Sequence, residues 1–269
     1  TPPVLIPVDK GFSAIQKSVH ECALAGCNTI WIVANQDLAP LVRKVVGEWV
    51  YDPVYYGRNR YGETSEHRKE IPIYYTPIDL KDMGRKDSYG WSILSGIYSA
   101  WRTASKISKW IVPDKYFISF PMSAHDIYEI RKHRNMISNQ NNNFFMTHNG
   151  KTVKEGKLLP FTMTGDDYIL CRRDVNTRTT KEYCNTEEGE RYPSKKLPLE
   201  ERWSAKNFTL SEVINKVETD NACFVEVEWF YDMSSWEQYR LYMGSDKFIK
   251  KPFGPLTKPH KHANIPYKN

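Results

Sequence analysis

The first half of the chain alternates between two hydrophobic patterns, one typical of strands and the other typical of helices. Runs of apolar, β-branched and aromatic residues predict strands at 28–34, 71–77 and 115–120. Apolar residues spaced three and four apart predict helices at 13–25, from about 37 onward, at 91–108 and at 126–136. This alternation is typical of the α/β class, in which helices cover both faces of a mostly parallel sheet.

The helix expected at 13–25 has the clearest boundaries. Ser13 and Gln16 have the spacing of a capping box, and Gly26 is a typical residue to end a helix. Because ligands bind at the carboxyl ends of strands in α/β sheets, the loops that follow the three predicted strands are the places to look for a site.

The second half of the chain has more hairpin signals. Asn149-Gly150 is a strong signal for a two-residue hairpin turn. The apolar segments 157–163 and 168–175 flank Gly165-Asp166-Asp167, which predicts a second hairpin with these residues in its turn. The second half is therefore expected to be rich in β-structure.

Composition along the chain suggests one domain with an irregular end. Residues 177–204 are polar, charged and interrupted by proline, which predicts a long loop. We expect a single domain over 1–269, with an α/β half at 1–140, a β-rich half at 141–245 and a basic tail at 246–269.

The segment VEVEWFYDMSSWEQY, residues 225–239, changes from a strand pattern to a helix pattern at Asp232. Ser234 and Ser235 each stand three residues before a Glu or Gln, so the helix start is explained without Asp232. The carboxylate is either an ordinary turn residue or a ligand-facing group at a strand end. In the second case it suits Mg²⁺, which takes one or two carboxylates together with phosphate oxygens.

Composition and charge narrow the class of ligand. The net charge of +6 and the pI of about 8.9 favour phosphate-bearing ligands. Nucleic acid is unlikely as the main ligand, because the chain has no basic helix and no RNP-like motif. No apolar run is long enough to span a bilayer, and no signal peptide is visible. Five irregularly spaced cysteines indicate reduced thiols, as expected of a cytoplasmic protein.

Two segments resemble the sugar nucleotidyltransferases, also called nucleoside-diphosphate-sugar pyrophosphorylases. The residues PPVLIPV at 2–8, followed by a helix ending in Ala25-Gly26 and an apolar strand, resemble the family's P-K-x-L-L-P-V element and its surroundings. The segment YDMSSWEQY at 231–239 is similar to the family's late W-x-D-[IV]-x-T-P-E-[DE]-[YL] element, in which the Asp binds metal. The order of strands and helices between these segments also agrees.

The resemblance implies a Rossmann-like three-layer α/β/α nucleotidyltransferase fold, with a nucleotide-binding half at 1–140 and a sugar-binding half at 141–245. It implies that a sugar 1-phosphate attacks the α-phosphorus of a nucleoside triphosphate, so that pyrophosphate leaves and a nucleotide sugar forms. Mg²⁺ is the implied cofactor and Asp232 the implied metal ligand.

The loop 84–92 corresponds to a glycine-containing loop that the family places against the nucleotide. The expected nucleotide-binding residues are therefore Arg85, Lys86, Ser88 and Gly90. The expected partners are a nucleoside triphosphate and a sugar phosphate, without a membrane. The aromatic-rich segment 49–61 is a candidate interface for a homo-oligomer.

Three features depart from the family pattern. The family's G-x-G-T-R-x-x-P-x-T loop immediately precedes P-K-x-L-L-P-V, which would place it before Thr1. Pro3 stands where the family has Lys, and Ser119-Phe120-Pro121 stand where it has a Gly-Asp carboxylate. No catalytic residue is assigned.

These departures leave two alternatives open. One is a relative that binds a nucleotide or a sugar phosphate but has lost efficient catalysis. The other is a glycosyltransferase that uses a nucleotide sugar, with Asp232 or Asp167 on the metal.

Overall fold

The computed structural model of the chain describes residues 2–54, 70–78, 89–179, 184–198 and 208–252. None of the helices in these ranges combines the length and the apolar character that crossing a membrane requires. The five cysteines are free thiols.

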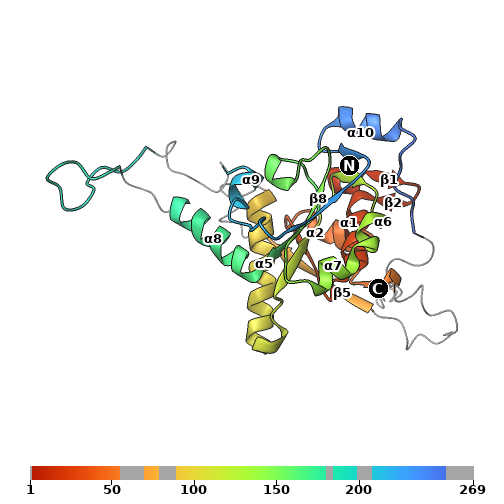
Figure 1. Ribbon diagram of the computed structural model, residues 1–269, viewed down its shortest axis with the longest axis horizontal. Coiled ribbons are helices and arrows are strands. Elements are labelled where there is room, and N and C mark those ends of the chain that lie inside the picture. Colours follow the sequence, from red (N-terminus) through yellow and green to blue (C-terminus); the bar gives the residue numbers. More distant parts are fainter. Residues whose placement is uncertain (1, 55–69, 79–88, 180–183, 199–207, 253–269) are drawn as a thin grey trace, which may run out of the picture.

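The described elements are short, apart from the two long helices α5 and α8 (Figure 1). In chain order they are η1 (Pro3–Leu5), β1 (Pro7–Asp9), β2 (Phe12–Ser13), α1 (Ala14–Ala25), β3 (Ile30–Ala34), α2 (Ala39–Val46), β4 (Trp49–Tyr51), β5 (Glu70–Pro77), α5 (Tyr89–Ile107), η3 (Lys109–Ile111), β6 (Lys115–Ile118), β7 (Ser123–His125), α6 (Tyr128–Lys132), α7 (Arg134–Asn139), β8 (Phe144–Thr147), η4 (Val153–Glu155), β9 (Phe161–Thr164), α8 (Gly165–Thr179), α9 (Leu210–Val213), β10 (Cys223–Glu226), β11 (Phe230–Asp232) and α10 (Trp236–Met243).

The strands form two larger and two very small sheets. The first larger sheet has the order β3-β5-β4, with β3 parallel and β4 antiparallel to β5. The second has the order β10-β8-β9-β6, with β10 parallel to β8 and the other pairs antiparallel. The pairs β1-β2 and β7-β11 are both antiparallel. The protein is thus a mixed α/β structure, as predicted. The sequence also predicted one mostly parallel sheet, whereas the described sheets are small and of mixed direction.

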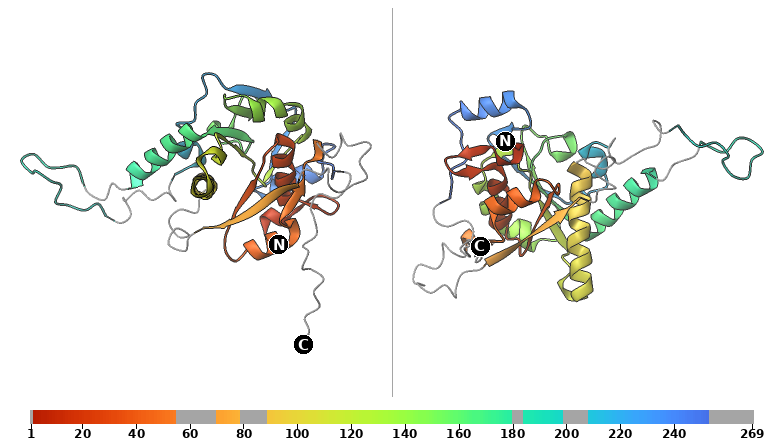
Figure 2. Two further views of the ribbon diagram at one scale, coloured as in Figure 1. Left: turned by 90° about the horizontal axis from the view of Figure 1, so that it is seen from below. Right: turned by 180° about the vertical axis from the view of Figure 1, so that it is seen from behind.

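Two apolar cores lie on either side of helix α1. The smaller core joins α1 and α2 to the first sheet, and it includes Ile15, Val19, Ile32 and Val46. The larger core joins the second sheet to α5 and to the helices packed around it, with several phenylalanines at its centre. In the left view of Figure 2, α5 is seen almost end-on beside the orange strands of the first sheet. Because it contributes to both cores, α1 is buried on nearly all sides.

Several predicted elements are confirmed, because local signals determine them. The side chains of Ser13 and Gln16 form the expected capping box of α1, and Gly26 ends the helix with φ of 93°. Asn149 and Gly150 both have positive φ between the bridged residues His148 and Lys151, which is the predicted two-residue turn. The strands at 28–34, 71–77 and 115–120 and the helix at 91–108 are also present.

The predicted hairpin around Gly165-Asp166-Asp167 is wrong, because these residues form the first turn of α8. Thr164 and Asp167 exchange hydrogen bonds between side chain and backbone, which is the arrangement of a capping box. Tyr168, Cys171 and Val175 then present one buried helical stripe. The second half of the chain is consequently less rich in β-structure than predicted.

The strand predicted before Asp232 is divided into two. Residues 223–226 form β10, which runs parallel to β8, whereas residues 230–232 form β11, which runs antiparallel to β7. The helix that follows is confirmed as α10, with the hydroxyl of Ser235 accepting a hydrogen bond from the backbone N–H of Gln238 at 3.3 Å.

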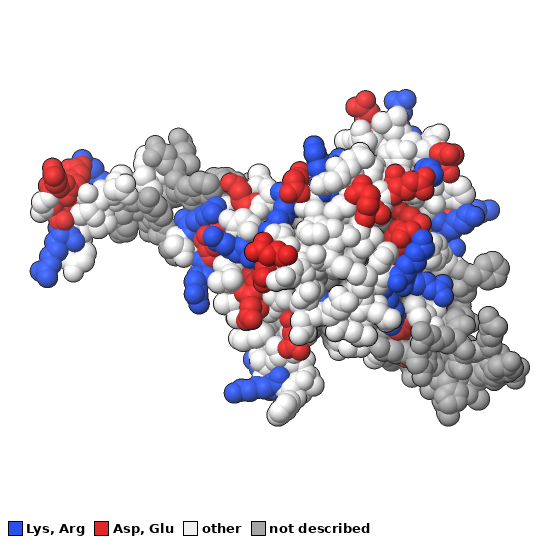
Figure 3. All heavy atoms as spheres, in the orientation of Figure 1, with Lys and Arg blue, Asp and Glu red and all other residues white. Residues whose placement is uncertain are grey.

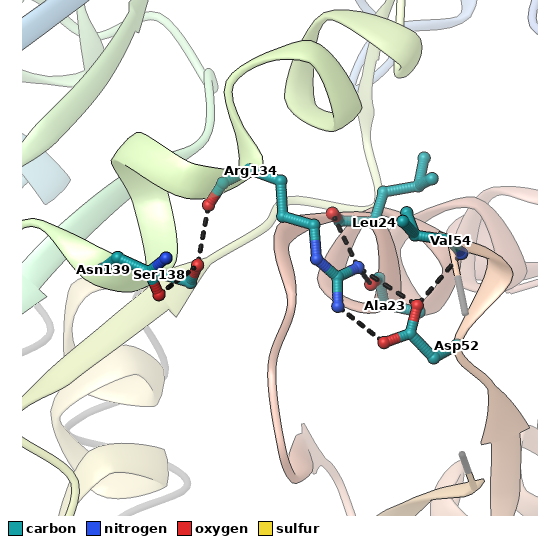
Figure 4. A network of polar contacts seen from close by, with 7 residues as sticks. All are labelled: Ala23, Leu24, Asp52, Val54, Arg134, Ser138 and Asn139. Carbon is teal, nitrogen blue, oxygen red and sulfur yellow. Dashed lines mark hydrogen bonds and ion pairs between the residues drawn. The ribbon is translucent and has the colours of Figure 1, made fainter. Parts of the chain in front are cut away.

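An ion pair between Arg134 and Asp52 fixes the carboxyl end of α1 (Figure 4). The guanidinium donates to both carboxylate oxygens of Asp52, at 3.1 and 2.6 Å, and to the carbonyls of Ala23 and Leu24 at 2.9 and 3.3 Å. Asp52 is 1 % exposed, so this ion pair is buried on its acidic side. The contact joins α7, α1 and the chain that follows β4.

Arg134→Met is expected to lower the free energy of unfolding by about 2–4 kcal/mol, because it removes the hydrogen bonds that the guanidinium donates to a buried carboxylate and to two carbonyls at the end of α1. Urea denaturation followed by circular dichroism measures the change. Arg131→Met is the matched control, because Arg131 is an exposed side chain one helix earlier, and its effect should stay within about 0.5 kcal/mol. Equal effects of the two variants would contradict the assignment.

Candidate functional site

A cavity of about 1590 Å³ lies between the two larger sheets. Residues of β3 and β6 line it, and so do residues of α1 and α5 along much of their length. Tyr89 and Ser92 at the amino end of α5, together with Ser119 and Phe120 after β6, line one part of it. The carboxyl end of β6 and the start of α5 therefore meet at this cavity.

Tyr89 connects the start of α5 to the end of β6. Its ring stands edge-on to that of Phe120, with centroids 6.1 Å apart and an interplanar angle of 89°. Phe120 is buried and stacks on Phe161 of the second sheet. Tyr89 itself is 45 % exposed, so one side of its ring is fixed by packing while the other remains accessible to a ligand.

Asp232 lies at the end of β11, opposite Ser123 of β7. Its Oδ1 accepts hydrogen bonds from the backbone N–H of Ser234 at 3.0 Å and from the hydroxyl of Ser234 at 2.6 Å. The backbone N–H of Met233, the next residue, donates to the carbonyl of Met122 at 2.8 Å. The carboxylate is half-buried and does not itself line the cavity.

The charge of Asp232 nevertheless acts on the phenol of Tyr89. Burial raises the pKa of the Tyr89 phenol, the negative charge of Asp232 raises it further, and a hydrogen bond with Ser234 opposes both effects. The phenol is therefore neutral at physiological pH and can donate or accept a hydrogen bond. We call Tyr89, Phe120, Asp232 and Ser234 the Tyr89 cluster.

The Tyr89 cluster fits only one kind of metal binding. Among the described residues, no three His, Cys, Asp or Glu side chains gather where they would hold a metal ion. The described residues supply two hydrogen bonds to Oδ1 of Asp232 and none to its Oδ2. The oxygen Oδ2 fits a Mg²⁺ that is held mainly by phosphate oxygens and water, with one carboxylate oxygen from the protein. The described residues do not fit a cation enclosed by protein ligands alone.

The predicted nucleotide-binding residues are only partly covered by the structure. Arg85, Lys86 and Ser88 lie outside the described residues. Gly90 is the second residue of α5 and is buried, and a Cβ added there would lie 2.6 Å from Cγ2 of Val213. The absence of a side chain at Gly90 thus allows α5 to pack closely on α9. A contact between Gly90 and a nucleotide stays a prediction.

Asp167 has a structural role at the start of α8. It is 5 % exposed and accepts hydrogen bonds from Asn143 Nδ2 at 2.7 Å, from the hydroxyl of Thr164 at 2.8 Å and from the backbone N–H of Glu218 at 3.1 Å. Both of its oxygens are engaged inside the protein. This makes Asp167 a poor candidate for the metal ligand of a glycosyltransferase.

Sequence reasoning missed a buried polar cluster beside the cavity. Lys17 Nζ lies 3.0 Å from Glu21 Oε1 and also donates to the carbonyls of Phe120 at 3.0 Å and Ser123 at 2.6 Å. Glu21 accepts from the hydroxyl of Ser119, and its Oε1 lies 3.2 Å from Nε2 of His125. The i, i+4 spacing of Lys and Glu on α1 was the available signal, but it usually marks an exposed helix face.

On the face shown in Figure 3, acidic and basic side chains of the described residues are interspersed.

No model of a known protein family matches the chain, and no curated protein sequence matches it significantly.

Proposed function

We propose that this protein binds a nucleoside triphosphate with Mg²⁺ at the Tyr89 cluster and transfers the nucleotidyl group to a sugar 1-phosphate. In this reaction a phosphate oxygen of the sugar 1-phosphate bonds to the α-phosphorus, the bond from the α-phosphorus to the bridging oxygen of the β-phosphate breaks, and pyrophosphate leaves.

The observation that carries the proposal is the position of Asp232. It pairs with Ser123, three residues after the ring of Phe120 that Tyr89 contacts, and its charge acts on the phenol of Tyr89, the first residue of α5. Arg85, Lys86 and Ser88 directly precede α5 in the sequence. The expected metal ligand thus interacts with the helix that follows the expected phosphate-binding residues in the sequence.

Each group has a role that follows from its chemistry. The amino end of α5, a helix of 19 residues, favours negative charge. Asp232 Oδ2 is the oxygen left for the metal, while Ser234 holds Oδ1 in place. The ring of Tyr89 offers a flat apolar surface and a neutral hydroxyl to the ligand. When bound, Mg²⁺ neutralises charge on the phosphates.

The fold proposed with this function is a Rossmann-like three-layer arrangement. Its support is that residues of α1 and α5 contact opposite faces of β3: Ile32 packs in the core shared with α1, and Val33 meets Gly96 of α5. A cytoplasmic location and a homo-oligomer through segment 49–61 belong to the same proposal.

A binding protein without turnover is the second candidate. The observation that favours it is the sequence Ser119-Phe120-Pro121 at the end of β6, which brings no carboxylate to the point where the resembling family has one. Asp232 is then the one carboxylate that the proposal assigns to orienting the phosphates.

Pyrophosphate release distinguishes the two candidates. We expect release to require a nucleoside triphosphate, a sugar 1-phosphate and Mg²⁺ together, measured with a coupled phosphate assay over the common bases and sugars. Nucleotide at 100 times its Kd should also stabilise the protein by about 2.7 kcal/mol in thermal unfolding. Stabilisation without pyrophosphate would support the binding protein, and the absence of both would exclude both candidates.

A further inference from the structure

Two cysteines lie at the carboxyl end of α1, in the segment CALAGC at residues 22–27. The backbone N–H of Gly26 donates to the carbonyl of Ala23 at 3.2 Å, and that of Cys27 donates to the carbonyl of Cys22 at 3.1 Å. Together with the φ of 93° at Gly26, these two bonds define a Schellman motif. Such a motif brings the side chain after the glycine into contact with the last turn of the helix, and here both positions hold a thiol.

A hydrogen bond joins these two thiols. It is the largest cause that raises the pKa of Cys22, and burial raises that pKa further. Cys22 therefore keeps its proton at physiological pH and donates it in a hydrogen bond to the sulfur of Cys27. The two sulfur atoms are thus already neighbours in the folded chain.

Both thiols are accessible to a small reagent. Each side chain is only partly buried, and both line the cavity of about 1590 Å³. Cys171, in contrast, is 0 % exposed in the larger core, and burial raises the pKa of its thiol to about 11. The pair at the end of α1 therefore combines access with a neighbouring thiol, the two conditions for reversible oxidation.

The backbone holds the pair in place. The guanidinium of Arg134 donates to the carbonyls of Ala23 and Leu24 (Figure 4), and a Cβ added to Gly26 would lie 3.1 Å from its Nε. The main-chain bond between residues 22 and 27 also suits a disulfide, whose Cα atoms are about 4.4–6.8 Å apart. Holding two reacting groups together in this way favours the reaction between them.

We propose that Cys22 and Cys27 form a redox-active pair that a hydroperoxide converts into a disulfide. The thiolate of Cys27 attacks one peroxide oxygen and becomes a sulfenic acid, while the O–O bond breaks and the other oxygen leaves, with a proton, as alcohol or water. The sulfur of Cys22 then attacks that of Cys27, the S–O bond breaks, and the thiol proton leaves with the hydroxyl group as water. Each sulfur loses one electron and the peroxide gains both. The proposal does not depend on the nucleotide chemistry.

Oxidation by hydrogen peroxide tests the proposal. The folded chain is treated with increasing amounts, the remaining thiols are alkylated in urea, and the tryptic peptides are analysed by mass spectrometry. Cleavage after Lys17 and Arg43 leaves both cysteines in one peptide, residues 18–43. We expect this peptide to lose about 2 Da and to take up no alkyl group, and dithiothreitol should reverse the change.

Cys223 is the internal reference, because it is a partly exposed thiol on β10 that does not line the cavity. The pair should oxidise at least about tenfold faster than Cys223 in the folded chain. In urea, which removes the Schellman motif, this advantage should disappear. Three results would overturn the proposal: Cys223 oxidising first, a disulfide from either member of the pair to another cysteine, or the same advantage in urea.

Single variants separate the roles of the two thiols. In Cys22→Ser, the sulfenic acid of Cys27 has no thiol to react with, so dimedone should trap it in peptide 18–43. In Cys27→Ser, Cys22 keeps its proton and should stay unoxidised at the same amount of peroxide. Cys223→Ser is the matched control and should form the disulfide as readily as the unchanged chain. Equal trapping in Cys22→Ser and Cys27→Ser, or trapping in neither, would contradict the assigned roles.

Discussion

Replacing Lys17 with methionine is expected to lower the free energy of unfolding by about 3–5 kcal/mol, the largest stability effect that we predict for one side chain. Lys17 and Glu21 are both fully buried, and their side chains are 0 % exposed. The ammonium donates to the carbonyls of Phe120 and Ser123, and it lies 3.0 Å from Glu21 Oε1 as an ion pair. Methionine keeps much of the length but leaves the carboxylate of Glu21 buried without its cation.

Burial and ion pairing have opposite effects on the pKa values of Lys17 and Glu21. Burial lowers the pKa of Lys17 and raises that of Glu21, while the attraction between the two charges counteracts both shifts. His125 beside them has a pKa well below its usual value, because of burial and then the charge of Lys17, so its ring is neutral at pH 7. Lys17→Met removes the counter-charge and leaves the cost of burial in place.

A double variant separates pairing from packing. Lys17→Met with Glu21→Leu removes both charges, and we expect it to recover part of the loss, because no unpaired charge then remains buried. Lys44→Met on α2 replaces an exposed lysine and should change stability by less than about 0.5 kcal/mol. Urea denaturation midpoints measure all four proteins. A cost below 1 kcal/mol for Lys17→Met would show that the buried ion pair is absent.

The second large effect concerns activity. Asp232→Asn is expected to reduce Mg²⁺-dependent pyrophosphate release by about 100- to 1000-fold, which corresponds to ~3–4 kcal/mol of transition-state stabilisation. Asparagine has nearly the same shape and still accepts the two hydrogen bonds from Ser234, so the turn should stay intact. What it loses is the negative charge that binds a divalent cation.

Two measurements keep this prediction separate from a folding defect. The thermal midpoint without ligand should change little, whereas stabilisation by nucleotide with Mg²⁺ should largely disappear. The pKa of Tyr89 should fall in the variant, because the charge of Asp232 contributes to raising it. Asp246→Asn, an exposed carboxylate beyond α10, is the matched control. Full Mg²⁺-dependent activity in Asp232→Asn would show that the metal assignment is wrong.

Local signals in the sequence predicted much of the secondary structure, because they act over a few residues. The capping box of α1, its terminal Gly26 and the Asn149-Gly150 turn are examples. The error at Gly165-Asp166-Asp167 arose because two acidic residues after glycine resemble a turn. The spacing of Thr164 and Asp167 indicated a helix start, and it would have predicted α8 correctly.

Local sequence signals could not predict which strands pair with one another. The apolar pattern of residues 225–231 is continuous in the sequence, yet β10 pairs with β8 and β11 with β7. Which edge a strand meets depends on residues far away in the chain. The same limit applies to the candidate site: Asp232 could be proposed from its position after a strand, but its closeness to Tyr89 depends on packing between distant segments.

The carbonyls that Lys17 holds have a consequence for genetic screens. They belong to Phe120 and Ser123, on either side of Pro121-Met122, and the carbonyl of Met122 receives the N–H of the residue after Asp232. The hydrogen bonds of Lys17 thus connect α1 to the main chain that holds Met233, the residue after Asp232. Variants with weakened ligand binding should therefore map to the buried side chains of α1. In the described contacts, no residue of α1 touches the carboxylate of Asp232.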